Sequence, residues 1–152
     1  MAIALKRNGF VERQLEMSKY NGKRKHGSQL QQEEANIIWD RLKSFDDWII
    51  STHAFDRITE KGIRTTKEDI VSTIDNATIV EYKIDYNERS NRCDERVVLR
   101  ANAVVNDTYN LHAVYSISRG VVVSVWMNHI SDFHATLDWS IYDENMKVFG
   151  AE

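Results

Sequence analysis

The stretch TKEDIVSTIDNATIVEYKID, residues 66–85, decides the fold because the spacing of its apolar residues changes along it. In its first half, Ile70 and Ile74 recur at the spacing of a helix with one apolar face. In its second half, Tyr82 and Ile84 alternate with polar residues, which is the period of a β-strand. The stretch therefore predicts a short helix that is followed directly by a strand.

Three further segments with the same alternation follow, and polar residues separate each from the next. The four predicted strands cover residues 78–85, 96–105, 109–117 and 121–128. Because no helical pattern lies between these strands, we expect a four-stranded antiparallel meander. The apolar residues that the alternation assigns to its core-facing side are Val80, Tyr82, Ile84, Val97, Leu99, Ala101, Leu111, Ala113, Tyr115 and Ile117.

The last two strands can be aligned residue by residue if Arg119 lies at the centre of their turn. The expected core-facing pairs are Ile117–Val121, Tyr115–Val123, Ala113–Val125 and Leu111–Met127. The expected pairs on the opposite side are Val114–Ser124, His112–Trp126 and Asn110–Asn128. Arg100, one strand further, joins His112 and Trp126 on this open side. Its polar and aromatic residues are typical of a surface that faces solvent or a ligand.

Two more helices are expected before the strands. The first covers residues 28–46, where SQLQ has the form of a capping box. The second covers residues 53–61, with a Ser-Thr pair before it as a cap and Gly62 as its stop. After residue 128 we expect a polar turn and then a short helix or a final strand. Helices followed by a meander indicate an α+β fold, in one domain over residues 28–152.

The N-terminal segment differs from this domain in charge. Residues 1–27 hold seven Lys and Arg residues and two Glu residues, although the whole chain has a net charge of −3. We therefore expect residues 1–27 to form a basic, mobile arm on an acidic body. Such an arm can bind nucleic acid, and it is equally typical of a solvated extension or of one that mediates self-association.

The composition excludes several classes of protein. The chain has 152 residues, enough for one domain with a sizeable core, and no apolar run long enough to cross a membrane. Its single cysteine, Cys93, has no disulfide partner, so we expect a cytoplasmic protein. His129, Asp132 and His134 have the spacing of part of a metal site. Because a fourth ligand is missing, no metal and no other cofactor is expected.

A cationic strip, formed by His53, Arg57, Lys61 and Arg64, follows the helix predicted over residues 53–61 and continues just beyond it. The buried side of the same helix is expected to carry Phe55 and Ile58. Arginine can grip a phosphate with two hydrogen bonds, and histidine can transfer a proton near neutral pH. The strip is thus either a phosphate-binding surface or a solvated helix face that neighbouring carboxylates neutralise.

The remaining candidates lie on the meander. His129 and His134 follow the last strand, where loop residues are well placed for general acid–base catalysis. On the open side, Trp126 next to Arg100 is typical of a platform that stacks an RNA base. Two other interpretations stay open: His112 is simply a half-buried histidine stacked on Trp126, and Trp126 covers a helix or the N-terminal arm.

The segment STHAFDRITEKGI, residues 51–63, together with the helix and strands after it, resembles a family of small bacterial, phage and mobile-element domains. That family opens with approximately Ser-x-His-Ala-x-x-Arg-x-x-x-Arg-Gly-Ile. It is grouped with the RelE-like toxins and with the barnase, EndoU and colicin ribonuclease fold. The resemblance covers about residues 50–128, and it implies a RelE/barnase-like arrangement of the helices and the meander.

The resemblance places the basic positions of the family motif at His53, Arg57 and Lys61, where lysine replaces an arginine. The candidate catalytic residues that it implies, by motif or by position, are His53, Arg57, Arg100, His112, His129 and His134. The candidate nucleic-acid-binding residues are Lys61, Arg64 and Trp126. In this scheme one histidine is the general base, another is the general acid, and the arginines stabilise the charge of the transition state.

The expected function is therefore a small RNA-binding or metal-independent, ribonuclease-like protein of phage or mobile-element type. One alternative is a non-enzymatic accessory protein that binds a host protein or a cognate inhibitor. Another is a homo-oligomeric structural component that assembles through its N-terminal helix. A catalytic site requires His53, Arg57, His112 and His129 to converge within about 10 Å on one cleft.

Overall fold

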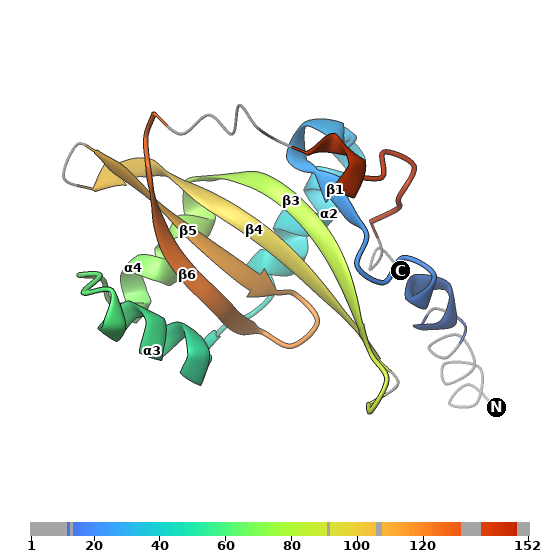
Figure 1. The fold of residues 1–152 in the computed structure, drawn as a ribbon, viewed down its shortest axis with the longest axis horizontal. Coiled ribbons are helices and arrows are strands. Elements are labelled where there is room, and N and C mark those ends of the chain that lie inside the picture. Colours follow the sequence, from blue (N-terminus) through green and yellow to red (C-terminus); the bar gives the residue numbers. More distant parts are fainter. Residues whose placement is uncertain (1–11, 13, 91, 106–107, 132–137, 149–152) are drawn as a thin grey trace.

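The computed structural model describes residues 12, 14–90, 92–105, 108–131 and 138–148. It is an α+β structure in which a single curled sheet carries helices α2 and α4 on one face, with helix α3 beside strand β6 (Figure 1). Among the described residues, no helix is long and apolar enough to span a membrane. We call the face under the helices the covered face and the other the open face.

The sheet has six strands in the order β1-β3-β4-β5-β6-β2, where four were expected. The strands are β1 (Arg24–His26), β2 (Ile49–Ile50), β3 (Ala77–Asn87), β4 (Arg92–Val105), β5 (Tyr109–Ser116) and β6 (Val121–His129). Strands β3 to β6 pair consecutively and antiparallel. The two added strands are short edges: β1 pairs antiparallel with β3, and β2 pairs parallel with β6.

The register of the last two strands agrees with the prediction except near their turn. His112 pairs with Trp126, and Ala113 pairs with Val125. A bulge after Val114 shifts the remaining residues, so that Tyr115 pairs with Val122 instead of Val123. The predicted pair of Ile117 and Val121 is also wrong, because Ile117 belongs to the turn, which Gly120 closes with a φ of 70°.

A second bulge corrects the predicted inner face of β3. The register shifts between Ile79 and Glu81, so Val80 does not lie on the core-facing side. Tyr82 and Ile84, beyond the bulge, are fully buried as predicted. The extra residue also leaves Glu81 on the open face, opposite Val98. Because side chains alternate along a strand, one inserted residue reassigns the face of its neighbours.

The helices are α2 (Gln32–Lys43), α3 (Thr52–Glu60) and α4 (Lys67–Ser72), with 3-10 turns η1 (Gly27–Gln29), η2 (Thr73–Asp75) and η3 (Trp139–Ile141). The predicted cap of α3 is confirmed, because Ser51 accepts from the Ala54 amide, and Thr66 caps α4 by accepting from the Asp69 amide. Gly62 ends α3 with a φ of 62°.

The predicted start of the first helix at Ser28 is wrong. Ser28 lies in the 3-10 turn η1, where its amide donates to the ring nitrogen Nδ1 of His26. The backbone is then extended at Leu30, and α2 begins only at Gln32. Just before this helix, the backbone amide of Gln31 donates to the Glu34 carboxylate. The capping interaction at the N-terminus of α2 therefore involves Gln31 and Glu34 instead of the predicted pair of Ser28 and Gln31.

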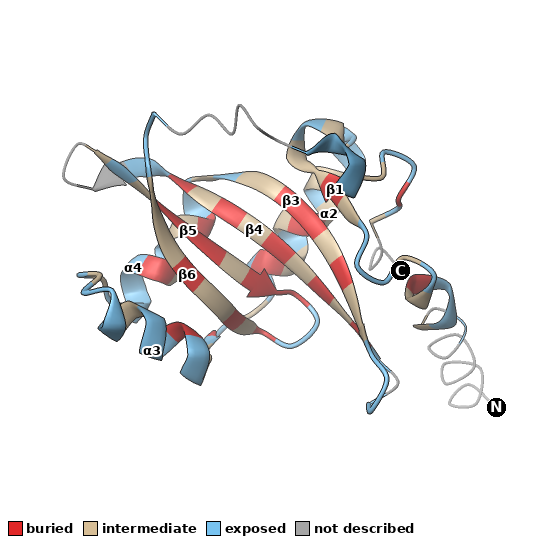
Figure 2. Cartoon of the chain, viewed as in Figure 1, coloured by how far each residue is buried: buried red, intermediate tan, exposed pale blue. Residues whose placement is uncertain are grey.

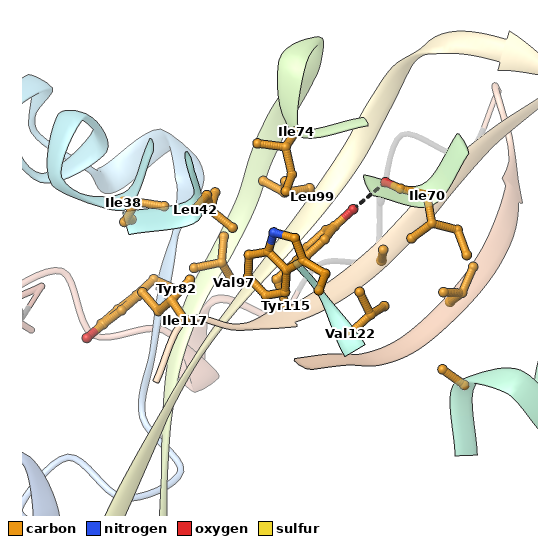
Figure 3. Packing of buried hydrophobic residues seen from close by; sticks show 14 of the residues in the cluster. Ile38, Leu42, Ile70, Ile74, Tyr82, Val97, Leu99, Tyr115, Ile117 and Val122 are labelled. Atoms are coloured by element: carbon orange, nitrogen blue, oxygen red, sulfur yellow. Dashed lines mark hydrogen bonds between the residues drawn. The ribbon is translucent and has the colours of Figure 1, made fainter. Parts of the chain in front are cut away.

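The core lies between the sheet and the helices. Trp48, Tyr82 and Tyr115 are its largest fully buried side chains, and alternate residues along β4 are buried (Figure 2). The hydroxyl of Tyr115 donates to the carbonyl of Ile70 at 2.6 Å, which ties the sheet to α4 (Figure 3). Burial raises the pKa of Tyr115 to about 12, so the phenol stays protonated and keeps this bond.

The end of the basic N-terminal segment, predicted to be a mobile arm, belongs instead to the sheet as β1. Lys25, in β1, is only 5% exposed and donates to Glu34 of α2 at 2.8 Å and to the Met146 carbonyl at 2.9 Å. Gly27 follows where a Cβ atom would lie 2.0 Å from the carbonyl oxygen of Ile79. The edge strand and the C-terminal segment are therefore fastened to each other and to α2.

Candidate functional site

Four side chains form a row across the open face of the sheet. The register pairs Thr78 with Arg100, Arg100 with His112, and His112 with Trp126. Each residue comes from a different strand of β3 to β6. The predicted proximity of Arg100, His112 and Trp126 is therefore confirmed by the strand pairing.

His112 and Trp126 stack on each other. Their ring centroids are 5.3 Å apart and their planes differ by 23°. His112 is only 3% exposed, and its Nδ1 atom lies 3.3 Å from the carbonyl oxygen of Asn110. Trp126 is half-buried, and its stacking on the imidazole restricts the orientation of the indole. The arrangement fixes the plane of the indole and leaves part of it accessible.

A groove with a volume of about 320 Å³ lies on this face beside the stacked pair. Three valines from successive strands, Val80, Val98 and Val114, contribute an apolar floor. The bulge in β3 is what places Val80 there. The wall opposite Trp126 consists of His26 from β1 and Tyr142 from the C-terminal segment. The groove thus combines an apolar floor with aromatic rings at both sides.

A third ring, Trp139, packs against His26 and Tyr142 next to the groove without lining it. The centroid of the His26 ring lies 5.0 Å from the ring centroid of Trp139 and 5.2 Å from that of Tyr142. The Tyr142 hydroxyl donates to Glu81 at 3.1 Å, and Arg24 pairs with the same carboxylate at 3.2 Å. Burial, and then the charge of Glu81, raises the pKa of Tyr142 to about 12. We call His26, Trp139 and Tyr142 the second aromatic wall.

Most cations at the groove are already paired with carboxylates. Arg24 is paired with Glu81, and Lys83 with Asp85 at 3.1 Å. Arg96, the third cation that lines the groove, lies 2.7 Å from Asp94. Arg100 differs, because no carboxylate in the described part of the chain forms an ion pair with it. Arg100 is thus a cation of the row that remains available to an anionic ligand.

Asp94, on the open face, forms ion pairs with both Arg96 and Arg119. Its carboxylate accepts from Ser116 at 2.5 Å and from Arg119 at 3.0 Å. Burial alone would raise the pKa of Asp94, but the hydrogen bonds from Arg119, Ser116 and Arg96 outweigh it and hold that pKa below its usual value. Asp94 is therefore an ionised, structural carboxylate.

The cationic strip lies on α3, away from this groove. His53, Arg57, Lys61 and Arg64 are all exposed. The helix packs beside β6 through Ala54, which is fully buried in the core of the covered face. None of these four residues lines the groove that contains His112 and Trp126.

The predicted buried side of α3 needs one correction. Ile58 is partly buried against the core, as predicted, but Phe55 is 64% exposed. Because α3 rests on the sheet only beside β6, the stripe of Ala54 and Ile58 is narrow enough to leave Phe55 in solvent.

The other candidate histidines do not join the groove. His129, at the end of β6, is exposed and lies edge-on to Tyr109 with ring centroids 5.7 Å apart. It is three residues beyond Trp126, so it points to the other face about 10 Å further along the strand. His134 lies outside the described residues. Among the described residues, no group of three or more His, Cys, Asp or Glu residues could hold a metal ion.

Sequence reasoning missed the second aromatic wall. His26 and Tyr142 line the groove because β1 pairs with β3 and Tyr142 forms a bridge with Arg24, and Trp139 packs against both rings. The only local signal is that Arg24 and His26 lie two residues apart, on one face of a short strand. Three residues are too few for such an alternation to be recognised in the sequence.

Comparison with known proteins identified no relative of this chain. No protein-family model matches the chain, and neither a curated protein nor a solved structure is significantly similar to it. The fold and the site define an α+β protein with an aromatic groove on the open face of its sheet.

Proposed function

We propose that this protein binds single-stranded RNA on the open face of its sheet, with one base stacked on Trp126. The observation that carries the proposal is the row of Arg100, His112 and Trp126 across three neighbouring strands. It combines an oriented indole with a cation that has no carboxylate partner in the described part of the chain.

The chemistry of these side chains suits a nucleotide. Every base has a π-face, and stacking on an aromatic side chain contributes about 1–3 kcal/mol per base. Because His112 holds the indole of Trp126 in place, less side-chain entropy is lost when a base stacks on it. Arg100 can then donate hydrogen bonds to the adjoining phosphate. The resemblance of residues 51–63 to domains of a ribonuclease fold group supports RNA as the ligand.

Binding is better supported than cleavage. A metal-independent ribonuclease needs a base and an acid on either side of one phosphate. The two histidines that line the groove, His26 and His112, belong to β1 and β5. These strands are three spacings apart, which is about 14 Å and too far for one phosphate. His53 of the cationic strip does not line the groove, so it does not complete the pair.

The test is a binding measurement with a matched control. A fluorescently labelled single-stranded RNA of about twelve nucleotides, within the site sizes of single-strand-binding folds, is titrated with protein while anisotropy is recorded. We expect Trp126→Ala to weaken binding at least fivefold, from the stacking energy. Phe55→Ala removes an exposed aromatic ring from α3 and should leave affinity unchanged. The RNA should be recovered intact.

Two results would overturn the proposal. One is a wild-type protein that does not change the anisotropy of the RNA. The other is a Trp126→Ala variant that binds as tightly as wild type while it melts at the same temperature. Cleavage of the RNA that is lost in His53→Ala would instead restore the catalytic role of the cationic strip.

A second candidate function, self-association, is favoured by the edge of the sheet at β2. This edge strand leaves Ile49 61% exposed, and Phe55 close behind it in the chain is 64% exposed. Unpaired edges and exposed apolar side chains are typical of surfaces that bind another chain. Sedimentation velocity tests it: a dimer that becomes monomeric in Phe55→Asp supports this function, and a wild-type monomer contradicts it.

A further inference from the structure

We infer that the bound RNA crosses the sheet from Trp126 to the second aromatic wall, so that the site takes a segment of about three nucleotides. This inference rests on the proposed function and adds to it the length of the bound RNA and its path across the sheet. It gives the rings of His26, Trp139 and Tyr142 a role as a second stacking position.

The second aromatic wall is built to stay in place. The centroids of its three rings lie 5.0–5.6 Å apart, and the Tyr142 hydroxyl donates a hydrogen bond to Glu81. The backbone is fixed as well, because the Asp143 amide donates to the Arg24 carbonyl at 2.7 Å. Trp139 is nevertheless 52% exposed. An indole that neighbouring rings hold, yet that remains half open to solvent, can accept a base.

The distance between the two aromatic positions decides how many nucleotides are needed. Trp126 lies on β6 and His26 on β1, four strand spacings apart in the sheet order. Four spacings are about 19 Å, whereas bases stacked on each other are only about 3.4 Å apart. One base cannot contact both positions. An extended strand that crosses the sheet can, and aromatic residues on a four-stranded sheet stack two or three bases in this way.

The charges of the groove indicate that the bases supply most of the affinity. Arg24, Lys83 and Arg96 line the groove and are each paired with a carboxylate. Arg100 alone, among the described cations in or beside the groove, lacks such a partner. About one phosphate is therefore neutralised, so the slope of log affinity against log salt should be only about −0.7.

The experiment measures affinity against RNA length. Oligouridylates from the mononucleotide to the hexanucleotide compete with the labelled RNA for wild type and for Trp139→Ala. For wild type we expect affinity to rise about tenfold between the dinucleotide and the tetranucleotide, when the second base reaches Trp139. In Trp139→Ala this rise should vanish, while binding of the mononucleotide is unchanged. Ile141→Ala, an exposed neighbour in the same turn, should behave as wild type.

The outcomes separate this inference from the proposed function. If Trp139→Ala keeps the rise with length while Trp126→Ala loses affinity, RNA binds at Trp126 but does not reach the second wall. If Trp126→Ala also keeps full affinity, both ideas fail. Trp139→Phe retains a ring for stacking and should restore the rise, which excludes a loss caused by local unfolding. A salt slope near −3 or steeper would contradict the base-dominated site.

Discussion

Both faces of the sheet carry a carboxylate that is hydrogen-bonded to arginine, but the two carboxylates differ in their surroundings. On β4, Glu95 points to the covered face and Asp94, its neighbour, to the open face, and each accepts hydrogen bonds from an arginine. Glu95 is buried between β4 and α2, whereas Asp94 is partly exposed on the solvent-accessible face. The covered face is therefore expected to govern stability, and the open face to govern binding.

The largest effect is expected from the covered face. Glu95 is 3% exposed and accepts from Arg41 at 2.8 Å and from the buried Tyr82 hydroxyl at 2.5 Å. Glu95→Ala leaves both donors without this acceptor, so we expect the free energy of unfolding to fall by about 3 kcal/mol. Urea denaturation followed by circular dichroism measures it. Glu95→Gln, which keeps an acceptor for Tyr82, should lose less, and a loss below about 1 kcal/mol in the alanine variant contradicts this role.

The next effect separates binding from stability on the open face. Trp126→Ala removes the ring stacked on His112, a contact worth about 1 kcal/mol in addition to the area that this half-buried indole buries. Because the indole is only half-buried, the unfolding free energy should fall less than in Glu95→Ala, while RNA affinity falls at least fivefold. Parallel urea denaturation and anisotropy titrations provide the comparison. A variant that loses as much stability as Glu95→Ala would show that the open face is part of the core.

A smaller, pH-dependent effect is expected at Asp94. Hydrogen bonds keep the pKa of this carboxyl in the folded protein below that of the unfolded chain, which is about 3.9. Its stabilising contribution is therefore complete above that value and is lost as the pH falls through the folded pKa. Asp94→Asn should cost about 1 kcal/mol at neutral pH, and its difference from wild type should shrink below about pH 4. Denaturation at several pH values tests this, and a difference that grows on acidification contradicts it.

The smallest effects are expected on α3. His53 and Arg57 are exposed and lie outside the groove, so alanine at either position should change stability by less than about 0.5 kcal/mol. RNA affinity should change less than twofold. Anisotropy and thermal denaturation of the two variants decide the point. A large loss of RNA binding in Arg57→Ala would move the binding surface from the open face to the cationic strip.

Much of the fold could be predicted because its signals are local. The change of period after Ile74 locates the start of the sheet, and the alternation around His112 assigns that residue to the open face. Ser51, Thr66 and Gly62 identify helix ends, because a cap depends on residues only a few positions away.

The errors arose where distant residues decide the structure. Neither bulge has a sequence signature: Val80 is an ordinary strand residue, and only pairing with β4 shows that it is the inserted one. The strand around Lys25 was missed because its partner, Tyr82, lies far along the chain. The site was incomplete for the same reason, since Tyr142 reaches the groove from the opposite end of the sequence.

The most direct test of the central claim is a ¹H–¹⁵N spectrum recorded while unlabelled RNA is added to ¹⁵N-labelled protein. The four tryptophans provide separate indole signals, with Trp126 and Trp139 beside the groove and Trp48 buried in the core. Binding on the open face predicts shifts of the Trp126 and Trp139 indole signals and of amides around His112, with Trp48 and the α3 amides unmoved. Shifts confined to α3, with Trp126 unchanged, would contradict the account.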